Sequence, residues 1–412
     1  MHRVIAAVLV VTACAASAQA QTSTSPVLTL SQAIQLARSA APTMDAASAG
    51  VRAASAARDV AGLRPNPTIS TDIENVGGSR AYNLVEAPKQ TVSVGVPVEL
   101  GGKRSARIAV ADAQGRRAAI DQAATEADLR LTVTKAYVEA VAADRRLTTA
   151  RAQATIADDA VRAAHVRVAA GRASPLEEQR ADVLRVNADA AVDRATRLAE
   201  LAHANLLRRI GRSVLGPLDE RWFDRIDSYG PTQPLDAGRT LALATARSDE
   251  QAAAAQVKLA RSQRIPDVTL SAGARRLPIN NNVAAVFGIS VPLPLFNGGT
   301  AAVAQASAEQ ERASALRRAA ELDTDQAVAQ AQADVANAVA TARAASGPAL
   351  ASAEEAARIA RIGYREGKFG QLDLIDAERT LAETRAAAID ALAAFHNAQA
   401  ELDRLTTTIS KD

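Results

Sequence analysis

Residues 91–102 read Thr-Val-Ser-Val-Gly-Val-Pro-Val-Glu-Leu-Gly-Gly, with a valine at every second position from Val92 to Val98. Alternation of period two is typical of a strand that has one apolar and one more polar face. The paired glycines that follow permit a sharp bend, because glycine tolerates backbone conformations that other residues avoid. The stretch therefore predicts a strand that ends at a bend, after which a long helix begins at Gly102.

The same order of features occurs twice in the chain, about 200 residues apart. Three matched pairs carry this repetition: residues 64–70 with 264–271, residues 94–102 with 289–299, and Gly171 with Gly367. A fixed order of elements in both halves indicates an internal duplication. We therefore expect a first repeat at residues 21–230 and a second repeat at residues 231–412.

Each repeat is expected to contain a first helix, two strands and a long helical hairpin. The first helices are expected at 29–60, with Ser31 as the N-cap, and at 236–263. Strands are expected at about 67–76, 89–100, 267–277 and 282–294, and each is close to the ~9–11 residues that a tilted transmembrane strand needs. The hairpin tips are expected near 171–176 and 366–371.

Two features are expected where these elements meet. Prolines that cannot continue a helix are placed at the strand–helix junctions, at Pro65, Pro67, Pro97, Pro266, Pro292 and Pro294. Residues 211–238 interrupt the helical pattern and contain the only tryptophan, Trp222. We expect this segment to form a small mixed region on the outside of the helices.

Apolar residues in the hairpins recur with gaps that alternate between four and three. In the first hairpin they are Leu129, Val133, Ala136, Ala140, Ala143, Leu147, Ala150, Ala154, Ala157, Val161, Ala164 and Val168. The last helix repeats the pattern from Leu374 to Leu405, and only Thr384 interrupts it. This is the heptad pattern of coiled helices. A helix from Gly102 to Val168 would be ~100 Å long at 1.5 Å per residue, so it must project from any compact domain.

The composition also favours long helices over a large globular core. Aromatic residues make up 2% of the 412 residues, whereas apolar residues make up 48%. The 48 basic and 45 acidic side chains are interspersed and leave a net charge of +3, so no nucleic-acid partner is expected. No run of about 18 apolar residues follows the N-terminus, so helical membrane spans are not expected either.

The first 20 residues are interpreted as an export signal. Arg3 precedes an apolar stretch at 4–12, and residues 18–20 form a small-x-small cleavage site. A second interpretation stays open, because residues 11–14 resemble a bacterial lipobox in which Cys14 would become the lipidated first residue. If cleavage follows Ala20, the mature chain has no cysteine.

Four strands are too few to close a barrel in lipid, where each unpaired backbone group costs several kcal/mol. Several copies must therefore combine their strands, and three copies would supply twelve. The expected fold is mixed α/β but mainly helical. It is a trimeric barrel, with four strands per protomer, embedded in a membrane and continuing into a long barrel of coiled helices.

The chain resembles the TolC family of outer-membrane efflux factors over most of its length. Residues 364–377, Tyr-Arg-Glu-Gly-Lys-Phe-Gly-Gln-Leu-Asp-Leu-Ile-Asp-Ala, are similar to the periplasmic-tip motif of that family, and residues 171–177 are similar to its companion tip. Residues 97–104 resemble the CzcC-like, heavy-metal branch. The resemblance implies a homotrimeric duct that receives substrate from a periplasmic adaptor and an inner-membrane pump of the RND type.

The resemblance also implies which tip residues act. Asp373 and Asp376 are one helical turn apart and share a face, and the resemblance places them at the periplasmic constriction. Tyr364 and Glu177 match a gate-forming pair on neighbouring hairpins, although Phe369 stands where the type member of the family has an arginine. The residues implied to meet the adaptor are Gly171, Arg172, Leu176, Gly367, Phe369 and Leu372.

The chain offers no pattern for catalysis or for a resident cofactor. The four histidines, His2, His165, His203 and His396, are far apart, and no P-loop spacing accompanies the glycines. The main hypothesis is a passive duct, with heavy-metal cations as its cargo. The alternatives are an outer-membrane factor for drugs, other small molecules or proteins, a periplasmic coiled-coil spacer without a pore, and a secreted enzyme.

Overall fold

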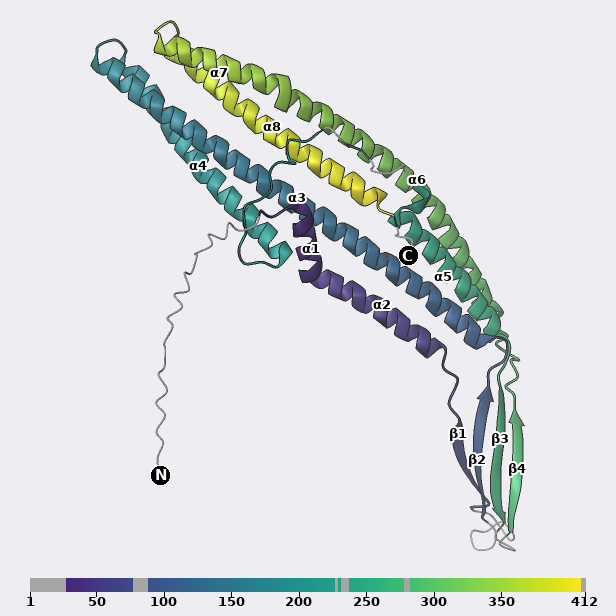
Figure 1. Cartoon of the computed structure of the whole chain (residues 1–412). Helices are drawn as coiled ribbons and strands as arrows, with labels where there is room; N and C mark the ends of the chain where they lie inside the picture. Colours follow the sequence, from purple (N-terminus) through teal and green to yellow (C-terminus); the bar gives the residue numbers. More distant parts are fainter. Residues whose placement is uncertain (1–26, 77–87, 227–228, 231–236, 278–281, 409–412) are drawn as a thin grey trace, which may run out of the picture.

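The protein is described by a computed structural model that covers residues 27–76, 88–226, 229–230, 237–277 and 282–408. It is a long, curved molecule with a narrow sheet at one end and two helical hairpins at the other (Figure 1). The expected signal segment and Cys14 lie outside the described residues, so both interpretations of the N-terminus stay open.

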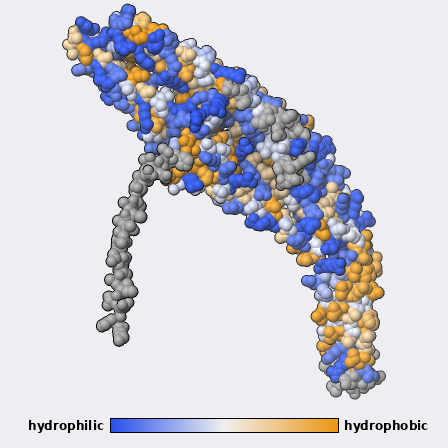
Figure 2. Space-filling view, in the orientation of Figure 1, coloured by the Kyte–Doolittle hydropathy of each residue, from blue (hydrophilic) through white to orange (hydrophobic). Residues whose placement is uncertain are grey.

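One antiparallel sheet contains the strands in the order β1-β2-β3-β4. The strands are β1 (Thr68–Glu74), β2 (Lys89–Val98), β3 (Val268–Leu277) and β4 (Asn282–Ser290). The register aligns Val94 with both Ile69 and Ala272, and aligns Ala272 with Phe287, so the apolar positions share one face. This face forms part of the hydrophobic band over the sheet in Figure 2.

The opposite face of the sheet is more polar. Ser70 and Ser93 form a hydrogen bond of 2.8 Å between their hydroxyl oxygens. Arg275 donates from Nε to Thr91 Oγ1 at 2.9 Å and lies 3.5 Å from a Glu74 carboxylate oxygen. The alternation expected from the sequence is therefore confirmed across all four strands.

Two expectations for the sheet were wrong. β4 ends at Ser290, so the alternating residues Val291 and Leu293 lie beyond the strand. Pro97 lies inside β2 opposite Thr269, rather than at a junction. The pairing with β1 stops at Gly95, so this edge of β2 is open beside Pro97 and tolerates a residue that has no N–H group.

Eight α-helices form most of the rest of the described chain. They are α1 (Leu30–Ala40), α2 (Pro42–Ala61), α3 (Lys103–Ala169), α4 (Pro175–Ile210), α5 (Leu241–Gln263), α6 (Thr300–Ala344), α7 (Leu350–Arg365) and α8 (Gln371–Thr406). None of them has a stretch that is long and apolar enough to cross a bilayer, within the residues described. With 67 residues, α3 is the projecting helix that the heptad pattern predicted.

The first helix differs from the expected one at its start and in its middle. Thr29, not Ser31, is the N-cap: Thr29 Oγ1 accepts from the Gln32 N–H at 3.3 Å, and Gln32 Oε1 accepts from the Thr29 N–H at 3.0 Å. The helix then breaks at Ala41, because Pro42 disfavours a helical conformation in the residue before it.

The helices lie side by side in two successive sets. Next to the sheet the order is α2-α3-α5-α6, which repeats the order of the strands; beyond the middle of the molecule it is α4-α3-α8-α7 (Figure 1). Every position of the two heptad seams is buried or half-buried. Between α6 and α7 a π-helical turn, Ala345–Ala349, interrupts the helix at Gly347 and Pro348.

The largest core cluster lies at the middle of the molecule, where residues 215–226 pack against the helices. Phe223 is fully buried, and Trp222 contacts the rings of Tyr137 and His396 at centroid distances of 5.9 and 4.1 Å. The Tyr137 hydroxyl donates to the Leu28 carbonyl oxygen at 2.7 Å. The segment that contains Trp222 is thus fixed to α3 and α8.

Candidate functional site at the hairpin tips

Each hairpin reverses direction at a glycine in the left-handed conformation. Gly171 and Gly367 have φ values of 66° and 73°, a region in which a Cβ atom is unfavourable. Ser174 is the N-cap of α4, its Oγ accepts from the Leu176 N–H at 3.3 Å, and Pro175 is the first helical residue. These local rules reverse the chain from α3 into α4 and from α7 into α8.

The two hairpins are joined by a hydrogen bond between their tips. The buried Tyr364, near the end of α7, donates its hydroxyl to Glu177 Oε1 on α4 at 3.2 Å. Gln371, the first residue of α8, donates its side-chain amide to the Glu177 carbonyl oxygen at 2.9 Å. The structure therefore brings together Tyr364 and Glu177 within one chain.

Arg167 completes this contact and is not among the residues expected from the sequence. Its guanidinium lies over the Tyr364 ring, 5.0 Å from the centroid, and its Nε is 3.6 Å from Glu177 Oε1. A guanidinium over an aromatic face is attracted by the negative charge density of the ring. Arg167 comes from the last turn of α3, so no motif near Tyr364 could have indicated it. Phe369 instead packs on Gly363, where an added Cβ atom would overlap its ring.

Burial raises the pKa of the Tyr364 phenol, and the negative charge of Glu177 raises it further. The phenol is therefore neutral at physiological pH and keeps its hydroxyl hydrogen for donation. We call Tyr364, Glu177, Arg167 and Gln371 the tip latch. Chemically, it is a set of hydrogen bonds and charges that links the two hairpins at their tips.

Asp373 and Asp376 are both exposed on the first turns of α8. Asp373 Oδ2 accepts from the Gly370 N–H at 2.9 Å, so this carboxylate also stabilises the start of α8. Among the residues that the structure describes, no third acidic, histidine or cysteine side chain joins them in a group that could hold a metal ion. Gly171, Arg172, Leu176, Gly367, Phe369 and Leu372 are likewise exposed at the tips.

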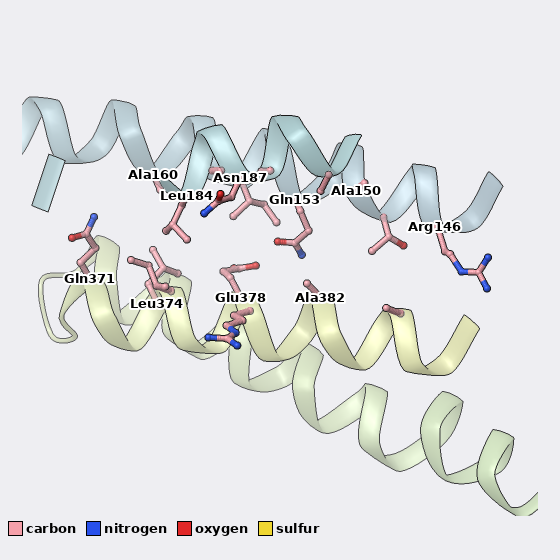
Figure 3. A pocket seen from close by; sticks show the side chains of 18 of the residues that line it. Arg146, Ala150, Gln153, Ala160, Leu184, Asn187, Gln371, Leu374, Glu378 and Ala382 are labelled. Carbon is pink, nitrogen blue, oxygen red and sulfur yellow. The ribbon is translucent and has the colours of Figure 1, made fainter. Parts of the chain in front are cut away.

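A cavity of about 410 Å³ separates the first hairpin from α8 just behind the tip latch. Its lining is mostly alanine, leucine and isoleucine from α3, α4 and α8 (Figure 3). Glu378 on α8 is its most buried charged residue, and Arg361 on α7 holds that carboxylate through both oxygens. The two hairpins therefore touch at the tip but are loosely packed behind it.

Within the described part of the chain, no group of three or more histidine, cysteine or acidic side chains is arranged to hold a metal ion. The tip latch contains only one carboxylate, and Tyr364 and Arg167 both engage it. The arrangement suits a mechanical contact between helices rather than ion binding.

Comparisons with known proteins agree with this architecture. Residues 33–212 and 237–408, one segment in each repeat, match the family model described as outer membrane efflux protein. The chain is 29% identical over 384 residues to the cobalt-zinc-cadmium resistance protein CzcC of Cupriavidus metallidurans. The matched segment covers 92% of this chain and 90% of that protein. It is 32% identical over 294 residues, 70% of each protein, to the nickel and cobalt resistance protein CnrC of the same organism.

Solved structures share the fold at lower identity. The outer membrane protein VceC of Vibrio cholerae superposes with a TM-score of 0.73 at 21% identity, over 92% of this chain and 97% of that one. The CmeC outer membrane channel of Campylobacter jejuni gives 0.74 at 13% identity, over 93% and 87%. The resemblance to the TolC family is thereby confirmed. The chain belongs to the outer membrane efflux protein family, and it is an outer-membrane efflux channel with a periplasmic helical extension.

Proposed function

We propose that three copies of this chain form one continuous duct that conducts heavy-metal cations out of the periplasm. The observation that carries the proposal is the open sheet. β1 and β4 are its two edges, and they run in opposite directions because all neighbours are antiparallel. The β4 strand of one copy can thus pair with the β1 strand of the next, and three copies would close a twelve-stranded barrel.

The face of the sheet that carries Ile69, Val94 and Phe287 would meet lipid, and these side chains are exposed in the single chain. The helices support the same assembly. In the set α4-α3-α8-α7, α4 is the outermost helix on one side, and it carries exposed apolar side chains. These are Leu176, Val183, Val186, Leu198 and Leu201. An exposed apolar row along one helix indicates a helix partner.

The proposed cargo follows from the relatives, whose names state resistance to cobalt, zinc, cadmium and nickel. The proposed partners are a periplasmic adaptor that meets the exposed hairpin tips and an inner-membrane pump of the RND type. Asp373 and Asp376 of three copies would surround the narrow periplasmic end, where carboxylates attract cations. The tip latch would hold that end closed.

Replacing Asp373 and Asp376 together by asparagine is expected to weaken the block of single-channel current by a trivalent cation. Loss of about 1.4 kcal/mol of attraction lowers affinity tenfold, and a ring that loses all its carboxylates should lose at least that. Asparagine keeps the oxygen that accepts from the Gly370 N–H, so α8 retains its first turn.

Conductance across a planar bilayer, with the cation added on the periplasmic side, measures this effect. The matched control replaces Asp189 and Asp193, two exposed carboxylates of α4, by asparagine. Unchanged block in the tip variant would remove the acidic ring from the proposal. If the wild-type protein also forms no channel, the result would contradict the duct itself and favour a spacer without a pore.

Deleting the gene for this chain in its own host is expected to raise the cellular content of cobalt, zinc and cadmium when cells grow in sublethal amounts of these metals. The cause is loss of the exit path, and elemental analysis of washed cells measures it. Restoring the wild-type chain should restore the low metal content. If metal content stays unchanged while uncharged drugs accumulate, the cargo is a drug and the alternative of drug efflux holds.

A further inference from the structure

The segment that follows β4 carries a patch of large apolar side chains with no cover in the single chain. Leu293, Leu295 and Phe296 are 74%, 79% and 102% exposed. These residues connect β4 to α6 along the outer edge of the molecule, because β4 and α6 are the last members of their sets. A contiguous exposed patch that contains an unshielded phenylalanine indicates an interaction site.

A matching junction inside the chain shows what covers such a segment. The segment after β2 lies against the segment before β3, which comes from the other repeat. The Leu100 N–H donates to Asp267 Oδ1 at 3.0 Å, and Lys103 Nζ lies 2.7 Å from the same carboxylate. An added Cβ atom at Gly101 would come within 2.8 Å of Ile265 Cβ, so the two segments are in direct contact.

The segment before β1, at the opposite edge of the chain, is the one left without this kind of partner. Its Leu63 is 65% exposed, and Val60 at the end of α2 is also exposed. The backbone beneath is fixed, because Arg104 Nε donates to the Gly62 carbonyl oxygen at 2.5 Å and Arg107 donates to the Leu63 carbonyl oxygen at 3.0 Å. The segment before β1 therefore presents exposed apolar side chains on a backbone that is held in place by hydrogen bonds.

We infer that residues 293–296 of one copy pack on Val60, Leu63 and the following prolines of the next copy. This inference rests on the proposed function, since it names the contact that seals neighbouring copies at the boundary between sheet and helices. The internal duplication supplies the geometry: the contact between β2 and β3 within a chain becomes the contact between β4 and β1 across copies.

The two junctions differ in chemistry in a way that fits this assignment. The ion pair of the internal junction joins Lys103 to Asp267, and the equivalent positions at the open edges are Thr300 and Pro67. The segment after β4 is also two residues longer between its Val-Pro and its Gly-Gly than the segment after β2. The added residues are apolar, so apolar contact replaces the ion pair between copies.

Cysteine cross-linking in the intact chain tests the inference. Oxidation of a Leu63→Cys and Phe296→Cys double variant in native outer membranes is expected to give a covalent trimer on a non-reducing denaturing gel. The wild-type chain, oxidised in parallel, controls for Cys14, the one cysteine of the natural sequence, and should give no cross-link. The matched control pairs Leu63→Cys with Val283→Cys, at the far end of β4, and should give no cross-link.

A second variant tests whether Phe296 contacts a neighbouring copy or lipid. A Phe296→Trp variant in vesicles of brominated phospholipid should keep its fluorescence, whereas Leu270→Trp on the apolar face of the sheet should be quenched. Quenching of the first variant, or a trimeric mass without the expected cross-link, overturns the inference and leaves the duct intact. A monomeric mass in mild detergent would overturn the duct as well.

Discussion

A double replacement in the tip latch, Tyr364→Phe with Arg167→Ala, is expected to raise the resting conductance of the reconstituted channel on the order of a thousandfold. Each copy loses a hydrogen bond to a charged group, worth roughly 1.5–3 kcal/mol. If three copies open together, the losses add to at least about 4.5 kcal/mol, and every ~1.4 kcal/mol shifts the ratio of open to closed states tenfold.

The physical reason is the position of the latch. Tyr364 and Glu177 join the two hairpins at their tips, and the cavity behind them offers little packing there to replace the lost contact. Removal of Arg167 leaves the Glu177 carboxylate without its nearest cation, which favours separation of the tips into water.

Single-channel recording in a planar bilayer measures the effect. The matched control is Tyr229→Phe with Arg343→Ala, a tyrosine and arginine that stack at 5.5 Å in the middle of the molecule, away from the tips. If both double variants stay as closed as the wild-type channel, the latch does not hold the gate and another contact must do so.

Acidification from neutral pH to pH 4 is expected to destabilise the protein by about 3 kcal/mol through His396 alone. His396 Nε2 donates to the Phe223 carbonyl oxygen at 2.8 Å and is surrounded by the rings of Trp222, Phe223 and Phe395. Burial lowers the pKa of His396 from 6.5 to about 4, because desolvation penalises the charged imidazolium.

The direction of the effect follows from proton binding. Between about pH 6.5 and pH 4 the unfolded chain binds a proton at this histidine and the folded chain does not. The neutral imidazole therefore contributes its full stability above about pH 6.5, and this contribution is lost progressively as the pH falls from 6.5 to about 4. The middle segment should then detach from α8 before the outer parts of the hairpins melt.

Thermal unfolding followed by far-UV circular dichroism, at a series of pH values, checks this expectation. A His396→Gln variant can still donate to the Phe223 carbonyl oxygen but does not titrate, so its melting temperature should depend less on pH. The control is His203→Gln, which removes the half-exposed partner of Asp144, 2.9 Å away. Equal pH dependence of the wild-type protein and the His396 variant would contradict the assignment.

Periodic patterns were sufficient to predict the helices and strands themselves. The alternation around Val92–Val98 and the heptads of α3 and α8 depend only on neighbours along the chain, because each element must turn its apolar side chains to one face. The tip turns also followed from local rules, since Gly171, Gly367 and Ser174 satisfy the backbone at helix ends. Pro42 indicates the break between α1 and α2 by an equally local rule, although a single helix was expected over 29–60.

The duplicated order of helices and strands, the length of α3 and the family could be inferred from the sequence, because these depend on periodicity and on motifs within continuous segments. The folded chain was needed to show that Arg167 joins Tyr364 and Glu177, that His396 is buried against Trp222, and that Phe296 is left uncovered. Each of these facts depends on segments brought together from distant parts of the chain, and side-chain burial and charge pairing are set by that proximity rather than by any local pattern.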